Sequence, residues 1–464
     1  MTYRFPLRAA GLFLALALAP SPARGQTDSV SPTSTRDESL RTVRELRQKN
    51  KPGDAIRVSF AALKEFPNDP ELLEELRKSV RQASQADRHR DPTFQSRIMA
   101  MSSSDVLALY HEVLVKIQAH YVDSDRVATT RLFSQGVEEF LAALGEPNFV
   151  GQHLKGADEG TISKFREGMR KAWLGREVAT PAKASELVAE LGGTSKRLLG
   201  MRTINPVVCE FICGACNCLD EFSGYLSASQ YMAESSSTSQ MSVHPRIEDG
   251  AVGYLRISHF QASTPQEIEN ALKALTEMGP IRALILDLRG NIGGLFPAAV
   301  KTAEKFLPGG IIVTAQGQHD DANKVYTSTA GNAATDLPMV VLVDGETASA
   351  AEVLAVALRD NHRARLIGTA TFGKGTVQKV ITFTTAEEVD PESGKPRPRA
   401  AVRITLARLI GPSGTPISGV GVAPDQFVPD RDRQFDTALE QAKELARRYM
   451  SRMGMMNMSM GPGN

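Results

Sequence analysis

The chain has 464 residues, which is long enough for two or three domains. Its composition, 42% hydrophobic and 23% charged, is that of an ordinary globular protein. The 54 basic and 53 acidic residues leave a formal net charge of +1. This balance gives no electrostatic reason to expect nucleic acid or an anionic membrane surface as a partner.

The N-terminus has the layout of a secretory signal. Arg4 and Arg8 precede an apolar run, Ala9 to Ala19, and the small-residue site Ala23-Arg24-Gly25 follows a Pro/Ser break. The run is too short to span a bilayer, so we expect residues 1–25 to be a signal peptide rather than an uncleaved anchor. The mature chain is then expected in the periplasm or cell envelope, or secreted, with no membrane span.

Residues 26–37 are predicted to be a polar linker, and residues 38–235 are predicted to be helical. Apolar residues at helical spacing indicate three helices within 38–95, which resemble a tetratricopeptide hairpin but also suit generic helical packing. Residues 96–235 are predicted to form a helical cap, with a helical insertion over 148–205. The apolar positions are Leu40, Val43, Leu46, Ile56, Phe60, Leu63, Leu72, Leu73, Leu76, Val106, Leu109, Val113, Ile117, Leu132, Val137, Phe140, Leu141 and Leu144.

From residue 236 to 430 the pattern changes to short apolar or β-branched runs that alternate with helical patterns, which predicts an α/β core. The expected strands are Val252–Ile257, Ala283–Leu288, Gly310–Thr314, Val340–Val343 and Arg365–Ile367, and the expected helices include Pro265–Met278 and Pro297–Phe306. Residues 431–464 are predicted to form a helix, Phe435–Met450, and a Met-rich tail. Thioethers can bind Cu(I), but a low-complexity tail without structure is the favoured interpretation.

Ser349 is a candidate nucleophile. It follows a buried strand and a Gly turn, and it falls in the first turn of an Ala-rich helix. The helix N-terminus provides a partly positive field, and the N–H of Ala350 is placed to donate to an oxyanion. By itself this pattern is more often a helix cap.

Lys374 lies between Gly373 and Gly375. Because neither glycine has a side chain, the backbone could place the lysine amine in a tight, partly desolvated position. Desolvation lowers the pKa of a lysine and makes it a general base near neutral pH. The segment also nearly matches a phosphate loop from Gly368, but Gly375 replaces the required Ser or Thr and a strand pattern follows. A nucleotide-binding loop is therefore rejected.

A third segment, Asp287-Leu288-Arg289-Gly290-Asn291, ends a buried strand and is followed by Gly293 and Gly294. Paired glycines at such a junction leave backbone N–H groups unshielded, which suits the second half of an oxyanion hole. A tight turn would need glycine as well. Asp287 and Arg289 are expected to pair structurally rather than to take part in catalysis.

In this order, these segments resemble the carboxyl-terminal processing peptidases, also called tail-specific proteases. Ser349 and Lys374 are 25 positions apart, with Gln378 four further on, and both intervals agree with that family. Looser matches are Tyr121-Val122-Asp123 and Leu219-Asp220. The blocks are Asp287–Gly294, Gly345–Glu352, Thr371–Gln378, and Pro412–Gly414 with Gly419–Asp425.

The resemblance implies a crotonase-like (ClpP/crotonase) α/β protease core with an α-helical N-terminal cap. It implies that Ser349 attacks the peptide carbonyl, Lys374 takes its proton and Gln378 holds the lysine amine. The N–H groups of Ala350 and of Gly293 or Gly294 would stabilise the oxyanion. No cofactor and no metal are implied, and a Ser-His-Asp triad is unsupported because G-x-S-x-G is absent.

The chain departs from most members of the family where a PDZ domain is expected. Only about twenty residues separate Tyr231 from Val252, which is far below the size of a domain. We therefore expect no PDZ module, and tail specificity cannot be carried over. The N-terminal helices are a candidate site for recruiting substrate or an adaptor protein, and assembly into a homo-oligomer is left open.

All four cysteines, Cys209, Cys213, Cys216 and Cys218, fall within ten residues. In an exported protein, local disulfides are the leading interpretation, with three pairings allowed and a zinc site as the alternative. The favoured function is a serine endopeptidase that acts on unfolded or C-terminal segments of proteins. The alternatives are a catalytically silent peptide-binding scaffold and an acyl-CoA enzyme on the same fold.

Overall fold

The computed structural model describes residues 35–66, 69–235, 240–249, 251–389, 394 and 396–459. The predicted signal peptide and most of the linker lie outside these residues, as do the side chains of the Met-rich tail beyond residue 451. The described chain divides into two compact units. The first, here called the α/β unit, holds residues 240–377 and 407–459, and the second, the helical unit, holds residues 35–235 and 378–406.

A six-stranded sheet forms the centre of the α/β unit. Its strand order is β13-β8-β7-β4-β3-β2, and all neighbouring pairs are parallel except β2 with β3. The predicted strands of this sheet are confirmed, with ends that differ by one residue at most. The strands are β2 (Val243–Glu248), β3 (Val252–Ile257), β4 (Ala283–Asp287), β7 (Met339–Val343), β8 (Ala364–Gly368) and β13 (Gln426–Phe427).

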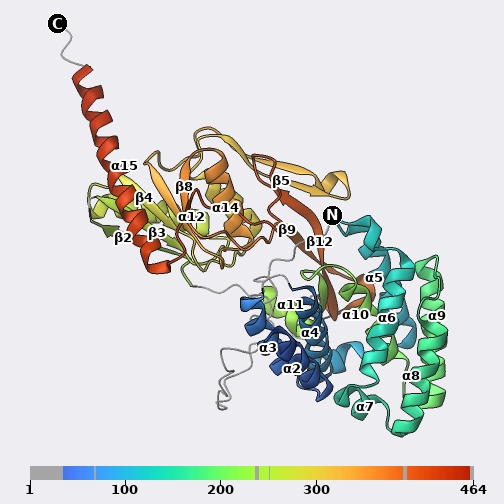
Figure 1. Ribbon diagram of the computed structural model, residues 1–464. Coiled ribbons are helices and arrows are strands. Elements are labelled where there is room, and N and C mark those ends of the chain that lie inside the picture. The colour runs from blue at the N-terminus through green and yellow to red at the C-terminus, as the bar shows by residue number, and fades with distance from the viewer. Residues whose placement is uncertain are drawn as a thin grey trace. The chain divides into compact units, whose positions relative to one another are not determined.

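The central strands β4 and β7 are buried on both faces, which is why they are almost entirely apolar, whereas the edge strands β2 and β13 are partly exposed. On one face, alternate residues such as Ile285 and Val340 pack against α15 (Arg431–Ser459), which crosses the strands in Figure 1. On the other face, residues such as Leu286 and Val341 pack against three helices. These are α12 (Thr264–Met278), α13 (Phe296–Glu304) and α14 (Ala350–Asp360).

The α/β unit also contains an antiparallel ladder outside the main sheet. Here β5 (Gly310–Gly317) pairs with β6 (Lys324–Ser328), and its other edge pairs with residues 407–410 of β12 (Ala400–Ile410). The predicted strand after Gly310 is thus confirmed but extends further. The helix expected to begin at Phe435 begins at Arg431, because the side chain of Asp430 accepts the N–H groups of Asp432 and Arg433 and caps it.

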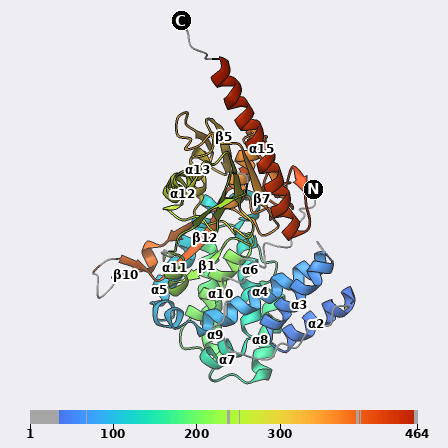
Figure 2. The ribbon, with the colours of Figure 1, turned by 90° about the vertical axis from the view of Figure 1, so that its left-hand side faces the viewer.

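The helical unit is built around α10, which contacts α5, α6 and α9 (Figure 2). The three helices expected first in the chain form as α2, α3 and α4, which pack on one another. Within the described part of the chain, no helix is both long and apolar enough to cross a membrane. The helices are α2 (Arg36–Gln48), α3 (Pro52–Glu65), α4 (Pro70–Arg90), α5 (Ser103–His120), α6 (Thr129–Ala143), α7 (Pro147–His153), α8 (Glu159–Trp173), α9 (Pro181–Leu199), α10 (Asn205–Asn217) and α11 (Ala228–Ser235).

Three short strands and parts of β9 and β12 complete this unit. β1 (Gly224–Ser227) pairs antiparallel with residues 400–403 of β12, and β10 (Glu387–Val389) forms a hairpin with β11 (Pro396–Pro398). The chain passes from the α/β unit to the helical unit within β9 (Thr376–Thr382) and returns within β12.

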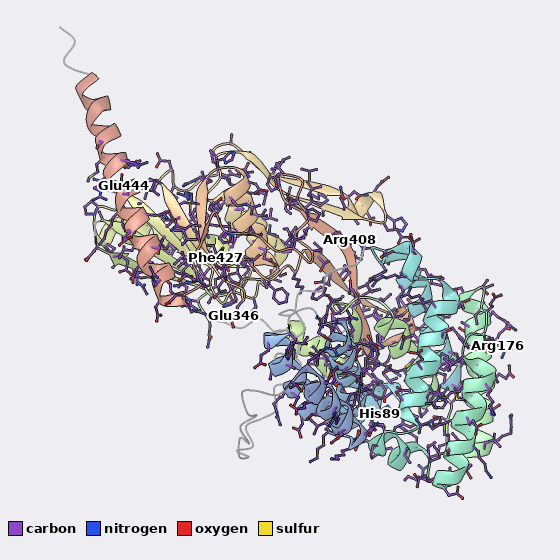
Figure 3. The ribbon with its side chains drawn as sticks, in the orientation of Figure 1. His89, Arg176, Glu346, Arg408, Phe427 and Glu444 are labelled. Carbon is purple, nitrogen blue, oxygen red and sulfur yellow. The ribbon has the colours of Figure 1, made fainter. Side chains whose placement is uncertain are left out.

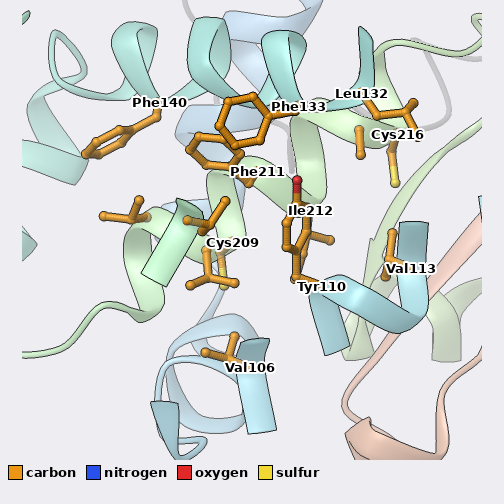
Figure 4. Packing of buried hydrophobic residues seen from close by; sticks show 14 of the residues in the cluster. Val106, Tyr110, Val113, Leu132, Phe133, Phe140, Cys209, Phe211, Ile212 and Cys216 are labelled. Atoms are coloured by element: carbon orange, nitrogen blue, oxygen red, sulfur yellow. The ribbon is translucent and has the colours of Figure 1, made fainter. Parts of the chain in front are cut away.

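The expectation of local disulfides is wrong. All four cysteines are unpaired thiols, buried in the core on or next to α10. Helix α10 is buried on every side, so its cysteines point to different neighbours and act as small apolar residues. Figure 4 shows Cys209 and Cys216 among the apolar side chains of α5, α6 and α10. Burial raises the pKa of all four thiols, and no three His, Cys, Asp or Glu side chains of the described residues converge as metal ligands.

Candidate active site

Ser349 occupies the turn between β7 and α14, directly before the first residue of the helix. Its backbone has φ 56° and ψ −118°, a left-handed conformation that residues with a side chain rarely adopt. Such strain costs about 1–3 kcal/mol and persists where surrounding bonds enforce it. The serine side chain is half-buried, so its hydroxyl is presented at a sharp turn on a helix N-terminus.

The bonds that enforce this turn come from Asp344 and Thr347. One carboxylate oxygen of Asp344 accepts three backbone N–H groups, each at 3.0 Å, from Gly290, Glu346 and Thr347. The Thr347 hydroxyl donates to the carbonyl of Leu288 at 2.9 Å. Hydrogen bonds of Asp344 and Thr347 therefore join the loop after β7 to the loop after β4.

Glu352 links the segment of Ser349 to the segment of Lys374. Its fully buried carboxylate accepts the backbone N–H of Ser349 and that of Lys374, both at 2.8 Å and both on Oε2. The other oxygen accepts the N–H of Gly373 at 2.6 Å and the hydroxyl of Thr371 at 2.5 Å. Because both nitrogens lie 2.8 Å from the same oxygen, the backbone nitrogens of Ser349 and Lys374 can be no further apart than twice that distance.

The same carboxyl group is also the most perturbed acid of this site. Burial raises the pKa of Glu352 to about 7, and the four donors around it act in the opposite direction. All four donors suit the ionised carboxylate; a proton on Oε2 would compete with a backbone N–H, whereas the Thr371 hydroxyl can turn to accept a hydrogen bond from a proton on Oε1.

Lys374 is buried, with 6% of its surface exposed. The glycines beside it are needed for close backbone approach, as the sequence predicts: a Cβ on Gly375 would lie 2.3 Å from the nitrogen of Ser418. The hydroxyl of Ser418 donates to the carbonyl of Gly375 at 2.5 Å, and the N–H of Gly419 donates to that of Gly373 at 2.9 Å. Residues 418–419 thus hold the lysine segment in place.

Two of the predicted oxyanion-hole residues, Gly293 and Ala350, lie beside Ser349. A Cβ added to Gly293 would be 2.9 Å from the Cβ of Ser349 and 3.1 Å from the nitrogen of Ala350. However, the N–H of Gly293 already donates to Oδ1 of Asn291 at 2.8 Å. The N–H groups of Gly294 and Ala350 have no hydrogen-bond acceptor among the described residues. Of the two glycines, Gly294 is therefore the one whose N–H is not already engaged by a described residue.

Gln378 belongs to the helical unit, where its amide nitrogen donates to the hydroxyl of Thr405 at 3.4 Å. The α/β unit itself brings together Ser349, Lys374, Ala350 and both glycines. The structural pairing of Asp287 with Arg289 is confirmed by bonds of 2.7–3.1 Å between the guanidinium and the buried carboxylate.

Sequence reasoning gave no role to Glu352 or Thr371, although both lie inside the motifs. One signal was present: a Glu three residues after a Ser at the start of a helix has the spacing of a capping box. That spacing predicts the bond from the backbone of Ser349, but it does not predict that the same carboxylate reaches residues 371–374.

The fold is an α/β core with a helical region N-terminal to it. Residues 251–428 match the model of peptidase family S41, so this part of the chain is similar to that family.

Curated relatives support this assignment over the same part of the chain. A carboxy-terminal-processing protease of Bartonella bacilliformis is 35% identical over 205 residues, which cover 43% of this chain and 44% of the relative. A carboxyl-terminal-processing protease of Synechocystis is 39% identical over 178 residues, or 38% of each chain. The chain therefore spans less than half the length of these relatives. A solved photosystem II D1 C-terminal processing protease is 21% identical, with a TM-score of 0.40 over 71% of this chain and 94% of that chain.

Proposed function

We propose that the chain is an exported serine endopeptidase that hydrolyses peptide bonds in unfolded or C-terminal segments of proteins. Ser349 is the nucleophile and Lys374 is the general base. The observation that carries this proposal is the buried carboxylate of Glu352, which binds the backbone N–H groups of both residues. The strained backbone of Ser349 adds support, because such strain collects at catalytic sites.

In the first half of the reaction, the neutral amine of Lys374 takes the proton of the Ser349 hydroxyl while Oγ attacks the peptide carbonyl carbon. A dry environment favours the neutral amine that this step requires. The carbonyl oxygen becomes an oxyanion, which the N–H groups of Ala350 and Gly294 stabilise.

In the second half, the tetrahedral intermediate collapses and the C–N bond breaks. The protonated amine of Lys374 gives its proton to the leaving nitrogen, so that an acyl ester remains on Ser349. A water then gives a proton to Lys374 and attacks the ester carbonyl. The C–Oγ bond breaks, Oγ takes the proton back, and the new carboxyl end departs.

Digestion of β-casein by the mature chain, beside Ser349→Ala and Lys374→Ala, tests this proposal. We expect each variant to lose about 10³-fold or more of the wild-type rate while its circular dichroism is unchanged. Lys379→Ala, which changes an exposed lysine of β9, is the matched control and should cleave at the wild-type rate. A Lys374→Ala protein that still cleaves normally would remove Lys374 as the base.

The competing interpretation is a catalytically silent peptide-binding scaffold. Retention of β-casein by an inert wild-type chain would favour it. A recruiting role for the N-terminal helices, without a PDZ module, is a separate proposal. Deletion of residues 38–90 should slow turnover of β-casein or of an adaptor-delivered substrate, and unchanged turnover of every substrate would contradict it.

A further inference from the structure

The loop that follows β4 contains a polar side chain to which the proposed chemistry assigns no part. Asn291 is fully buried, with 0% of its surface exposed. Its amide nitrogen donates to the carbonyl of Ile257, the last residue of β3, at 2.9 Å, and its amide oxygen accepts the N–H of Gly293 at 2.8 Å. Since a carbonyl can only accept and an N–H can only donate, these two partners fix the orientation of the amide.

The backbone of Asn291 is bonded to a third segment. Its carbonyl accepts the N–H of Ala348 at 2.9 Å, one residue before Ser349 in the turn between β7 and α14. Glu346, which is labelled in Figure 3, belongs to the same turn. Asn291 is therefore bonded at once to the end of β3, to the glycine pair and to the turn that carries Ser349.

The glycine pair is also bonded to Phe260. The N–H of Phe260 donates to the carbonyl of Gly293 at 2.8 Å, and the N–H of Leu295 donates to the carbonyl of Phe260 at 2.9 Å. This is the pattern of a parallel bridge, in which the residue opposite Phe260, Gly294, directs its own N–H away from Phe260. A Cβ on Gly294 would lie 2.1 Å from the carbonyl oxygen of Phe260, so this bridge requires glycine.

The glycine pair needs such support because its backbone has few restraints of its own. Gly293 has φ 107° and Gly294 has φ 135°, a region of backbone space that favours glycine. Without the amide of Asn291, the N–H of Gly293 and the carbonyl of Ile257 would lose their partners, and the loop would relax to find others. That relaxation would move Gly294, whose neighbour Gly293 lies against Ser349.

We propose that Asn291 is a positioning residue for peptide-bond hydrolysis. It holds Gly294 at the point where its N–H meets the oxyanion that forms when Ser349 attacks. Loss of one oxyanion donor lowers kcat about 10²–10³-fold, and a displacement of about 1 Å can have a similar effect. Both ends of the Asn291 amide are bonded to backbone groups, so substrate affinity should not depend on it. The inference rests on the proposed function, because it names what holds a donor of that site in place.

The first test is Asn291→Ala in the full chain, with β-casein as substrate and the rate expressed per folded chain. We expect kcat to fall about 10²-fold while KM changes by less than about twofold, because the lost interaction acts only on the transition state. A higher KM at an unchanged kcat would mean that Asn291 acts on substrate binding, and it would overturn the proposal.

Asn205→Ala is the matched control. Asn205 in α10 is also fully buried, and its amide nitrogen donates to the carbonyls of Met99 and Met101 at 3.1 and 2.8 Å. Both variants lose the hydrogen bonds of a buried amide, so both should unfold at a lower temperature than the wild type. Only Asn291→Ala should lower kcat per folded chain. An equal kcat in the two variants would make Asn291 a merely structural residue and overturn the proposal.

Asn291→Asp tests the same role should the alanine variant fail to fold. The aspartate keeps an oxygen for the N–H of Gly293, but only its protonated form can donate to the carbonyl of Ile257. The ratio of variant to wild-type kcat should be about 0.1 at pH 9 and rise about fivefold or more by pH 6. A ratio that does not change with pH would contradict the proposal. The other charged groups of the surrounding segments are the same in both chains and cancel from this ratio: Asp287 and Arg289 before Asn291, His259 after β3, Asp344 and Glu346 after β7, Glu352 of α14, and Lys374.

Hydrogen exchange followed by mass spectrometry gives a readout that needs no cleavage. In Asn291→Ala, the amides of residues 292–295 and 348–350 should exchange about tenfold faster than in the wild type, whereas Asn205→Ala should leave them unchanged. Unchanged exchange in Asn291→Ala would overturn the proposal. A wild-type chain that cleaves nothing would instead contradict the proposed function, and the exchange data alone would then decide whether Asn291 fixes the glycine pair.

Discussion

The backbone of Ser349 lies in a conformation that glycine adopts more easily than serine or alanine. We therefore expect Ser349→Gly to be more stable than Ser349→Ala by about 1 kcal/mol, measured by urea unfolding, although both are inactive. At Ser451, in the last third of α15, the order of stability should reverse, because glycine weakens a helix by about 1 kcal/mol relative to alanine. Equal stability of the two Ser349 variants would mean that the turn carries no strain.

Glu352 makes the stability of the α/β unit depend on pH. Burial raises its pKa from 4.5 to about 7, so between these values the unfolded chain is ionised while the folded chain keeps its proton. The folded state binds more protons in that window, and its stability must fall as pH rises from 4.5 to 7. A shift of this size corresponds to about 3 kcal/mol.

The measurement is the free energy of unfolding at pH 4.5 and pH 7 for the wild type and for Glu352→Gln, which cannot titrate. We expect the wild type to lose about 3 kcal/mol more than the variant across this window. Glu346→Gln changes an exposed carboxyl group nearby and should keep the wild-type slope. A wild-type slope in Glu352→Gln would place the carboxyl group at its ordinary pKa.

At the scale of elements, helices α6 and α10 cross where two glycines meet. A Cβ on Gly214 would lie 2.5 Å from the Cα of Gly136 and 2.7 Å from the carbonyl oxygen of Gln135, both backbone atoms that cannot yield. Gly214→Ala should therefore destabilise the helical unit by about 2–4 kcal/mol. Gly151→Ala, where a Cβ meets nothing, should stabilise it by about 0.5–1 kcal/mol. Thermal unfolding followed by circular dichroism distinguishes the two, and a stable Gly214→Ala would contradict the close crossing.

Elements with strong periodicity were predictable from the sequence. Val252–Ile257 is observed with the predicted ends, because a strand buried over most of its length is mostly apolar and polar turns bound it. The start of α15 was not predictable in this way, since Arg431 to Gln434 are polar and the helix depends on the cap from Asp430.

The candidate site was predictable only in part. Motif order identified Ser349 and Lys374, but the bond from Glu352 to residues 371–374 depends on a tertiary contact that no local pattern contains. The choice between Gly293 and Gly294 depends on the side chain of Asn291. The prediction of local disulfides failed for a similar reason. The spacing of the cysteines along the chain does not show that α10 is buried on every side.

At the scale of the whole molecule, the two compact units are not contiguous in sequence. Residues 378–406 belong to the helical unit, although they lie within the segment whose composition and motifs indicate the α/β core. The composition of the sequence does not reveal that residues 378–406 belong to the helical unit. The two boundaries fall inside strands β9 and β12, so no turn or linker marks either of them.

Export is the remaining prediction for the whole molecule, and it concerns residues outside the described part of the chain. Signal peptidases cut after small residues that follow an apolar run, so chain purified from an exporting host should begin at Gln26. The intact mass of the purified protein measures this directly. Leu14→Arg places a charge within the apolar run and should leave the protein unprocessed in the cell fraction, whereas Ser29→Arg, beyond the cleavage site, should be processed normally. Processing of Leu14→Arg at the wild-type rate, or a wild-type chain that keeps Met1, would contradict export by a cleaved signal.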